Sequence, residues 1–262
     1  MPPKSDRSTS LSLPTRVSVV VPLFNEVEGI PGLHRRLIDL REELLDSYIL
    51  DFILVDDGST DDTWQRLEEH FSGVDGCDLV RMPKNLGVAG AILAGLRQAS
   101  CEIVCSIDSD LSYDPGILAE MIPLIGDADL VTASPYHPDG EVLNVPRWRL
   151  VLSQGLSRIY NYRQQQKLHT YTSCCRVYRK KVVQEIELSR TDFIGVAELV
   201  LKMQEQGYRI AELPATLGTR AVGVSKMNIV KTIFGHLRLM YDLGLHRVRQ
   251  LPASHPSREE RS

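Results

Sequence analysis

Short apolar runs alternate with helix-periodic segments through the first half of the chain. Five strand-like runs lie at Val17–Pro22, Asp51–Val55, Asp78–Met82, Glu102–Asp108 and Asp129–Ala133. Between the first two strand-like runs, the apolar residues recur at the spacing of one face of a helix: Ile30, Leu33, Leu37, Leu40 and Leu44. Strands that alternate with helices in this way predict an α/β fold, a doubly wound and mostly parallel sheet with helices on both faces.

The pattern changes after Ala133, where the proline-containing segment Ser134–Pro146 begins. The elements predicted beyond it are helices at Arg147–Tyr162, Ala197–Gln206 and Met227–Leu245, and strands at Cys175–Tyr178 and Tyr208–Leu213. This half departs from simple strand and helix alternation. We therefore expect this half of the chain to supply the pocket for a second substrate.

Composition narrows the class of protein. With 262 residues, of which 43% are hydrophobic, the chain can bury the core of one large domain. The formal net charge of −4 gives no reason to expect nucleic acid as a partner. The five cysteines have no disulfide-framework or zinc spacing, which favours reduced thiols and a cytoplasmic protein. No segment approaches the roughly 18 unbroken apolar residues of a membrane span.

Polar side chains gather where three of the predicted strands end, in the pairs Asn25 and Glu26, Asp56 and Asp57, and Asp108 and Asp110. The carboxyl ends of parallel strands share one edge of a sheet, so we expect these pairs to converge. In SIDSDLSYDP (106–115), two carboxylates lie on one side if extended backbone continues through them, and such a pair favours a cation. Asp114-Pro115 then predicts a helix start, which makes this a strand-to-helix loop.

Four segments taken together, VSVVVPLFNEVEGI (17–30), ILVDDGSTDDT (53–63), KNLGVAGAILAGL (84–96) and SIDSDLSYDP, resemble the inverting family-two glycosyltransferases of the GT-A fold. The later segment GYRIAELPATLGTRAVGVSK (207–226) is similar to their polyprenyl-phosphate (dolichyl-phosphate) mannosyl- and glucosyltransferase branch. The resemblance covers roughly residues 17–245. It implies a hexosyltransferase that uses a GDP- or UDP-linked nucleotide-sugar donor and a polyprenyl or dolichyl phosphate acceptor.

The resemblance also implies a domain organisation. We expect one GT-A domain over residues 16–250 between two disordered tails, 1–15 and 251–262. Its parts would be a Rossmann-like nucleotide-sugar-binding half (16–134), an acceptor-binding half (135–226) and a C-terminal amphipathic helix (227–250).

Family-two relatives suggest a role for each strand-end residue. By this resemblance, the residues that bind the donor nucleotide are Pro22, Phe24, Asn25, Glu26, Asp56 and Asp108. Asp108 and Asp110 would hold Mg²⁺ or Mn²⁺ on the diphosphate, with Ser112 as a weaker ligand or replaced by water. Hard cations prefer carboxylate and phosphate oxygens, and a bound cation makes diphosphate a better leaving group. For Asp57 and the Lys84–Gly87 loop, the sequence leaves open whether they only form turns or also take part in function.

The acceptor is predicted from a missing base. A hydroxyl acceptor needs a general base, whereas a phosphate oxygen needs none. Relatives that glycosylate hydroxyls commonly carry an Asp where this chain has Gly195 and Val196, while Glu198 has the spacing of the polyprenyl-phosphate branch. The acceptor phosphate would be received by a basic set that, with Asp110, makes up the predicted catalytic residues: Arg149, Arg220 and Lys226.

Three departures from the family pattern leave alternatives open. Ser112 stands where relatives often have Gln, Pro135 where they have Arg, and the segment His169–Ser173 lacks their Asp. The first alternative is a glycosyltransferase that acts on a sugar hydroxyl, and the second is a non-catalytic nucleotide-sugar-binding protein. The third is a phosphotransferase of the haloacid-dehalogenase type, because the segment Asp108–Ser112 is similar to the nucleophile motif of that family.

The last predicted helix is amphipathic. Its apolar positions recur at helical spacing at Val230, Ile233, Phe234, Leu237, Met240, Tyr241 and Gly244. Positive charge comes from Lys231 and Arg238 and from the following Arg247 and Arg249. Such a stripe is either a core face or a surface that docks peripherally on the cytoplasmic face of a membrane. A membrane-protein partner would be the alternative tether.

Overall fold

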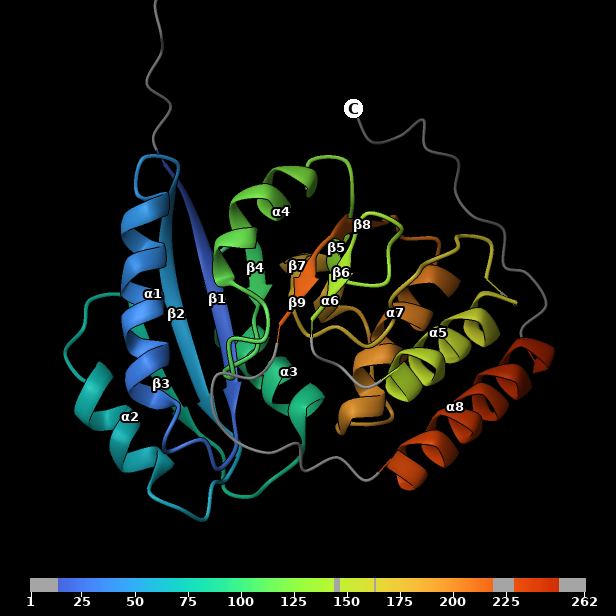
Figure 1. Cartoon of the computed structure of the whole chain (residues 1–262), viewed down its shortest axis with the longest axis horizontal. Helices are drawn as coiled ribbons and strands as arrows, with labels where there is room; N and C mark the ends of the chain where they lie inside the picture. The colour runs from blue at the N-terminus through green and yellow to red at the C-terminus, as the bar shows by residue number, and fades with distance from the viewer. Residues whose placement is uncertain (1–13, 144–146, 163, 219–228, 250–262) are drawn as a thin grey trace, which may run out of the picture.

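The computed structural model describes residues 14–143, 147–162, 164–218 and 229–249 (Figure 1). Its centre is a seven-stranded sheet in the order β3-β2-β1-β4-β7-β5-β8. Strand β7 runs antiparallel to β4 and β5, whereas the other neighbouring strands pair in parallel. The strands are β1 (Thr15–Leu23), β2 (Tyr48–Asp56), β3 (Cys77–Arg81), β4 (Ile103–Ser106), β5 (Leu130–Ser134), β7 (Arg176–Arg179) and β8 (Ile210–Pro214). The predicted α/β, mostly parallel sheet is confirmed.

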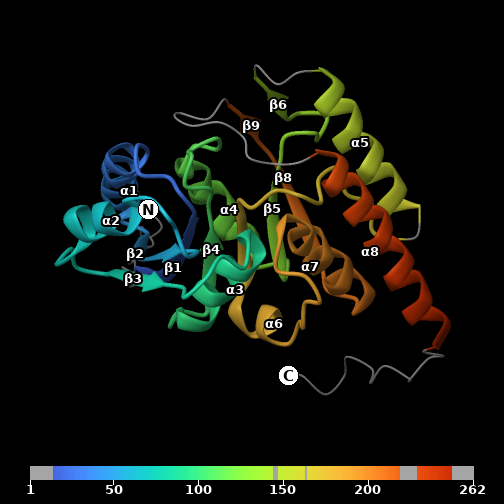
Figure 2. The same ribbon diagram turned by 90° about the horizontal axis from the view of Figure 1, so that it is seen from below.

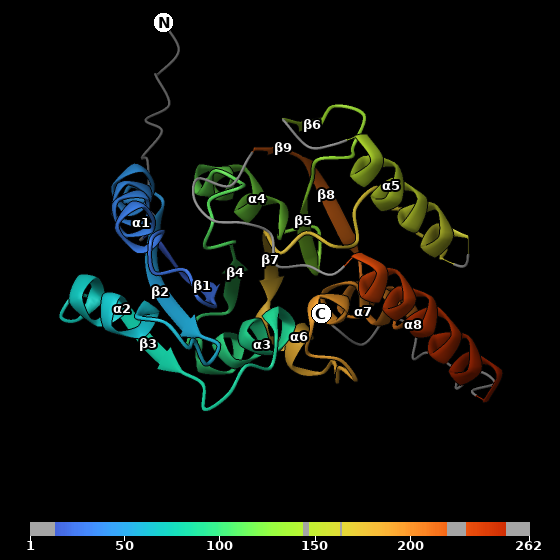
Figure 3. The same ribbon diagram turned by 60° about the horizontal axis from the view of Figure 1, so that its bottom comes forward.

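Helices cover both faces of this sheet (Figure 2). One face carries α1 (Ile30–Leu44), α2 (Thr63–Phe71) and α4 (Leu118–Leu124). The other carries α3 (Val88–Gln98), α6 (Lys180–Gln184) and α7 (Phe193–Glu205). Helices α5 (Arg147–Asn161) and α8 (Ile229–Arg249) lie side by side beyond α7, and a small second sheet pairs β6 (Glu141–Val142) with β9 (Thr216–Leu217) (Figure 3).

The central strand β1 shows how the apolar pattern builds two cores. Val19 and Val21 pack into the cluster beneath α1, while Val20 packs into the cluster beneath α3. On α1, the buried residues are the five whose spacing predicted the helix. Burying one such side chain stabilises the fold by roughly 1.5–3 kcal/mol, so the alternation along β1 fixes both layers at once.

Two helical segments start at aspartate residues whose side chains cap them. The Asp114 carboxylate accepts a hydrogen bond from the Gly116 N–H at 2.8 Å, as predicted, and opens a 3₁₀ turn that leads into α4. Helix α7 begins at Phe193 rather than Ala197, because the Asp192 side chain caps it by accepting from the Ile194 N–H at 3.2 Å.

No described helix is long and apolar enough to cross a membrane. Both predicted tails lie almost wholly outside the described residues.

Candidate active site

Asp56, the last residue of β2, is fully buried at the carboxyl edge of the sheet. Its Oδ1 accepts a hydrogen bond from the Ser59 N–H at 3.1 Å. Its Oδ2 has no hydrogen-bond donor within the described part of the chain, although the Arg81 Nε lies 3.6 Å away. An unsatisfied buried carboxylate oxygen costs free energy, so this atom is suited to receive an N–H group from a ligand.

The loop after β1 interlocks with the loop after β2. The Asn25 N–H donates to the Ser59 Oγ at 2.9 Å, and the Thr60 N–H donates to the Asn25 Oδ1 at 2.8 Å. The Glu26 N–H donates to the Thr63 Oγ1 at 2.8 Å. Asn25 has a φ of 54°, a left-handed conformation that Asn tolerates better than most residues. The Pro22–Glu26 loop is therefore joined to the loop after Asp56, and together they form one wall at this edge of the sheet.

Asp57 ties a third loop to this wall. Its Oδ1 accepts from the Leu86 N–H at 2.8 Å and its Oδ2 from the Gly87 N–H at 2.7 Å. Burial raises the pKa of Asp57, although these two hydrogen bonds act in the opposite direction. Gly58, with a φ of +68°, lies so close to Lys84 that a Cβ would sit 2.6 Å from its carbonyl carbon. Asp57 thus does more than cap a turn, since it fastens the Lys84–Gly87 loop.

The same loop is fastened on its far side to the start of α7. The Gly90 N–H donates to the Thr191 carbonyl oxygen at 2.8 Å, and the Thr191 Oγ1 donates to the Leu86 carbonyl oxygen at 2.6 Å. A Cβ on Gly87 would lie 2.8 Å from the Asp192 Cα. The segment from Leu86 to Gly90 therefore joins the nucleotide-side loops to the predicted acceptor half.

Asp108 and Asp110 follow β4 in a turn rather than in extended backbone. Leu111 has a φ of 54°, and its N–H donates to the Asp108 carbonyl oxygen at 3.4 Å. The condition that extended backbone continues through both carboxylates is therefore not met, because the turn starts at Asp108, whereas their predicted place in a strand-to-helix loop is confirmed. The Ser112 N–H donates to the Asp110 Oδ1 at 3.0 Å, so one carboxylate oxygen also orders the loop.

The described residues supply no cluster of three or more His, Cys, Asp or Glu side chains placed to hold a metal ion. Asp108 and Asp110, both partly exposed, offer hard carboxylate oxygens that suit Mg²⁺ or Mn²⁺ once diphosphate oxygens complete the coordination. Cys174 lies beneath them, and burial together with the Asp108 charge raises the pKa of its thiol. The thiol is therefore held protonated and is a poor metal ligand.

At position 195, in the first turn of α7, the packing leaves no room for a carboxylate side chain. A Cβ on Gly195 would overlap the Arg190 carbonyl oxygen and lie 2.8 Å from the Ala89 Cβ. Val196 is buried. The packing around Gly195 and Val196 therefore agrees with the lack of a base at these two positions.

Glu198 is fully buried and its oxygens are occupied. They accept hydrogen bonds from the Ser189 N–H at 2.8 Å, the Ser189 Oγ at 2.7 Å and the Arg190 N–H at 3.0 Å. The Lys202 Nζ lies 2.8 Å from the same carboxylate. This carboxylate orders the segment before α7, which is a structural task rather than that of a base.

The predicted basic set is only partly described. Arg149 lies in α5, with its side chain outside the described atoms, and Arg220 and Lys226 lie outside the described residues. The last residue described before them is Gly218, whose N–H donates to the Ser112 carbonyl oxygen at 2.8 Å. The chain therefore enters the Arg220 segment beside the Asp110 turn.

The sequence prediction missed Arg176, which is fully buried on β7. Its Nη1 donates to the Val196 carbonyl oxygen at 2.9 Å and its Nη2 to the Tyr171 carbonyl oxygen at 2.8 Å. It thereby fixes the backbone of α7 where a base would otherwise stand. The available signal was a charged residue inside the apolar run Cys174–Tyr178.

The fold and this edge of the sheet define a glycosyltransferase of the GT-A class. Residues 18–187 match the profile of Glycosyl transferase family 2, and the chain belongs to that family. The family match contradicts the haloacid-dehalogenase alternative.

Named relatives fall in the branch that the sequence resembles. The dolichol-phosphate mannosyltransferase of Pyrococcus furiosus is 30% identical over 231 residues, 87% of this chain and 63% of that protein. The chain thus spans less than two thirds of that relative. The polyprenol monophosphomannose synthase of Mycolicibacterium smegmatis is 29% identical over 221 residues, 81% of each chain.

A solved structure supports the fold. Glucosyl-3-phosphoglycerate synthase from Mycobacterium tuberculosis, in complex with Mn²⁺, UDP and glucosyl-3-phosphoglycerate, matches with a TM-score of 0.64 at 20% identity. The match covers 92% of this chain and 82% of that chain. At this identity the likeness shows the GT-A fold alone.

Proposed function

We propose that the chain transfers a hexose, with inversion, from a GDP- or UDP-linked sugar to a polyprenyl or dolichyl phosphate. The observation that carries the proposal is the packing at Gly195, which leaves no space for a carboxylate base at the position where relatives that glycosylate hydroxyls carry one. The names of the Pyrococcus and Mycolicibacterium relatives support the same acceptor class. A phosphate oxygen would attack the anomeric carbon as the bond to the diphosphate breaks on the opposite side.

The donor nucleoside would bind against the interlocked loops after β1 and β2. Its base would give an N–H group to the unsatisfied Asp56 Oδ2, and Phe24, Asn25 and Glu26 would line the same wall after Pro22. Base-edge recognition by one buried carboxylate fits either uracil or guanine, because both present N–H groups. The packing thus supports a nucleotide donor without selecting GDP or UDP.

Asp108 and Asp110 would hold Mg²⁺ or Mn²⁺ on the donor diphosphate, with Ser112 or a water beside them. When bound, the cation would neutralise the charge that develops on the leaving diphosphate. Arg149, Arg220 and Lys226 would receive the acceptor phosphate, because guanidinium and ammonium groups bind its oxygens well. The entry of the Arg220 segment beside Ser112 supports this placement. The reaction would occur at the cytoplasmic face of a membrane.

Transfer of radiolabelled hexose into an organic phase tests the proposal. The purified chain is given GDP- and UDP-sugars, Mn²⁺ or Mg²⁺, and a polyprenyl phosphate or free saccharides. We expect labelled lipid with one donor, with the label lost in Asp110→Ala. Label only on soluble saccharides would support a hydroxyl acceptor, and tight nucleotide binding without any transfer would support a non-catalytic binding protein.

A further inference from the structure

Helix α8 turns an apolar stripe away from the protein. Phe234 and Tyr241 are each 67% exposed, and Ile233 and Leu237 are exposed beside them. These positions share one side of the helix. The opposite side packs on the protein through buried residues such as Leu239. The predicted stripe is therefore largely an outer surface, and the core face of α8 is a different one.

Helix α5 extends this surface, which its sequence pattern did not predict. Val151, Leu152, Ile159 and the following Tyr162 are exposed on one side, with Tyr162 88% exposed. The neighbouring Tyr160 is buried, and its hydroxyl lies 2.7 Å from the His236 Nδ1 of α8. The two helices are thus held together at the end of the molecule remote from α1 (Figures 1 and 3).

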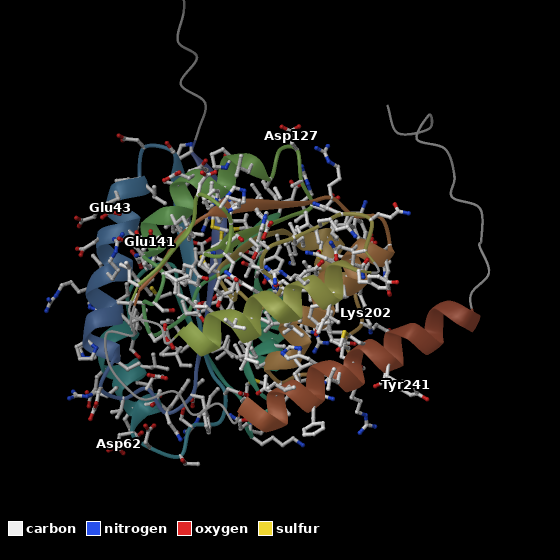
Figure 4. All side chains as sticks on the ribbon, turned by 45° about the vertical axis from the view of Figure 1, so that its right-hand side comes forward. Glu43, Asp62, Asp127, Glu141, Lys202 and Tyr241 are labelled. Atoms are coloured by element: carbon white, nitrogen blue, oxygen red, sulfur yellow. The ribbon has the colours of Figure 1, made fainter. Side chains whose placement is uncertain are left out.

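Close packing fixes α8 on the body of the protein. A Cβ on Gly235 would overlap the Ile194 Cδ1 of α7, so α8 and α7 approach each other closely at this glycine. The side chain of Tyr241 points outward from α8 (Figure 4). The exposed side chains named above on α5 and α8, here termed the apolar face, are consequently presented on a rigid support.

We propose that the apolar face docks on an anionic lipid bilayer. The proposal rests on the proposed function, because a lipid-linked phosphate is held at a membrane surface. Positive charge flanks the face, since Arg158 and Arg238 are exposed, although Asp242 lies 3.8 Å from Arg238. The sequence of α8 adds Lys231, Arg247 and Arg249. Tyr162 and Tyr241 suit the headgroup level of a bilayer, because a tyrosine side chain has an apolar ring that can contact lipid and a hydroxyl that can contact water.

Co-sedimentation with vesicles tests the docking. The full chain is mixed with phosphatidylcholine vesicles, or with vesicles containing a quarter phosphatidylglycerol, at low and high salt. We expect pelleting with the anionic vesicles at low salt. The double variant Phe234→Ser/Tyr241→Ser should bind about tenfold more weakly or worse, and Val151→Ser/Tyr162→Ser should also weaken binding. Arg158→Gln/Arg238→Gln should lose about 25-fold, at about fivefold for each charge.

Leu45→Ser is the matched control, because Leu45 is an exposed apolar residue at the end of α1, a helix on the opposite side of the molecule from α8 (Figure 1). It should bind vesicles like the unchanged chain. A chain that stays in the supernatant, or face variants that pellet normally, would overturn the docking. A dimer that dissociates in Phe234→Ser/Tyr241→Ser, without vesicle binding, would instead assign the face to a second copy.

A vesicle-free assay separates this inference from the proposed function. Transfer to a short-chain, water-soluble prenyl phosphate should persist in the face variants, because none of the substituted residues is placed in the site. Vesicle binding by a chain that transfers sugar to no prenyl phosphate would refute the proposed function and leave the docking supported.

Discussion

Acidification is expected to destabilise the chain through His236. This residue is buried on α8, and its Nδ1 lies 2.7 Å from the Tyr160 hydroxyl. Burial lowers the pKa of His236 from 6.5 to about 4, with the nearby Asp192 acting to raise it and Arg190 to lower it. The folded protein thus keeps this imidazole neutral at a pH where the unfolded chain would protonate it.

The magnitude follows from proton linkage. Between pH 6.5 and pH 4 the unfolded state binds more protons at this position, so stability is present above pH 6.5 and falls as the pH drops. With these two pKa values, the free energy of unfolding should decrease by about 2 kcal/mol between pH 7 and pH 5.

Urea unfolding at pH 7 and pH 5 measures this loss, and His236→Asn isolates it. The Asn amide can occupy the position of Nδ1 and bond Tyr160, but it does not titrate. The variant should lose about 2 kcal/mol less than the unchanged chain over the same pH interval. Equal losses in both proteins would refute the reasoning, because the pH dependence would then come from other groups.

Three further predictions concern the site. Calorimetry with UDP or GDP should show that Asp110→Ala abolishes Mn²⁺-dependent nucleotide binding. Ser112→Ala should only weaken this binding, since water can replace the hydroxyl. Equal nucleotide affinity of the unchanged chain with and without Mn²⁺ would contradict the metal assignment. Glu198→Gln should lower the unfolding free energy by about 3 kcal/mol in urea titration, by leaving its partners incompletely satisfied; unchanged stability with lost turnover would indicate a base. Gly195→Ala should lower the thermal midpoint, whereas the control Gly32→Ala should not, because a Cβ on Gly32 meets nothing within 4 Å.

Much of the candidate site could be predicted because its signals are local. Asn25, Asp56 and Asp108 each lie directly after an apolar run, and parallel strands bring such positions to one edge. The sequence placed Asp108 and Asp110 in a strand-to-helix loop but did not predict the turn within it, because a left-handed Leu111 has no signature in composition or periodicity. Arg176 was missed for a related reason, since its burial depends on carbonyl oxygens from Tyr171 and Val196 that lie elsewhere in the chain.

The sequence by itself determined the alternating strands of the first half, the apolar face of α1 and the identity of the strand-end carboxylates, because periodicity and chain order are properties of neighbouring residues. Only the tertiary structure decided that β7 inserts antiparallel between β4 and β5, that Asp57 holds Leu86 and Gly87, and that packing closes the base position at Gly195. These features join residues far apart along the chain, and their energies depend on distances of a few ångströms that a local pattern does not encode.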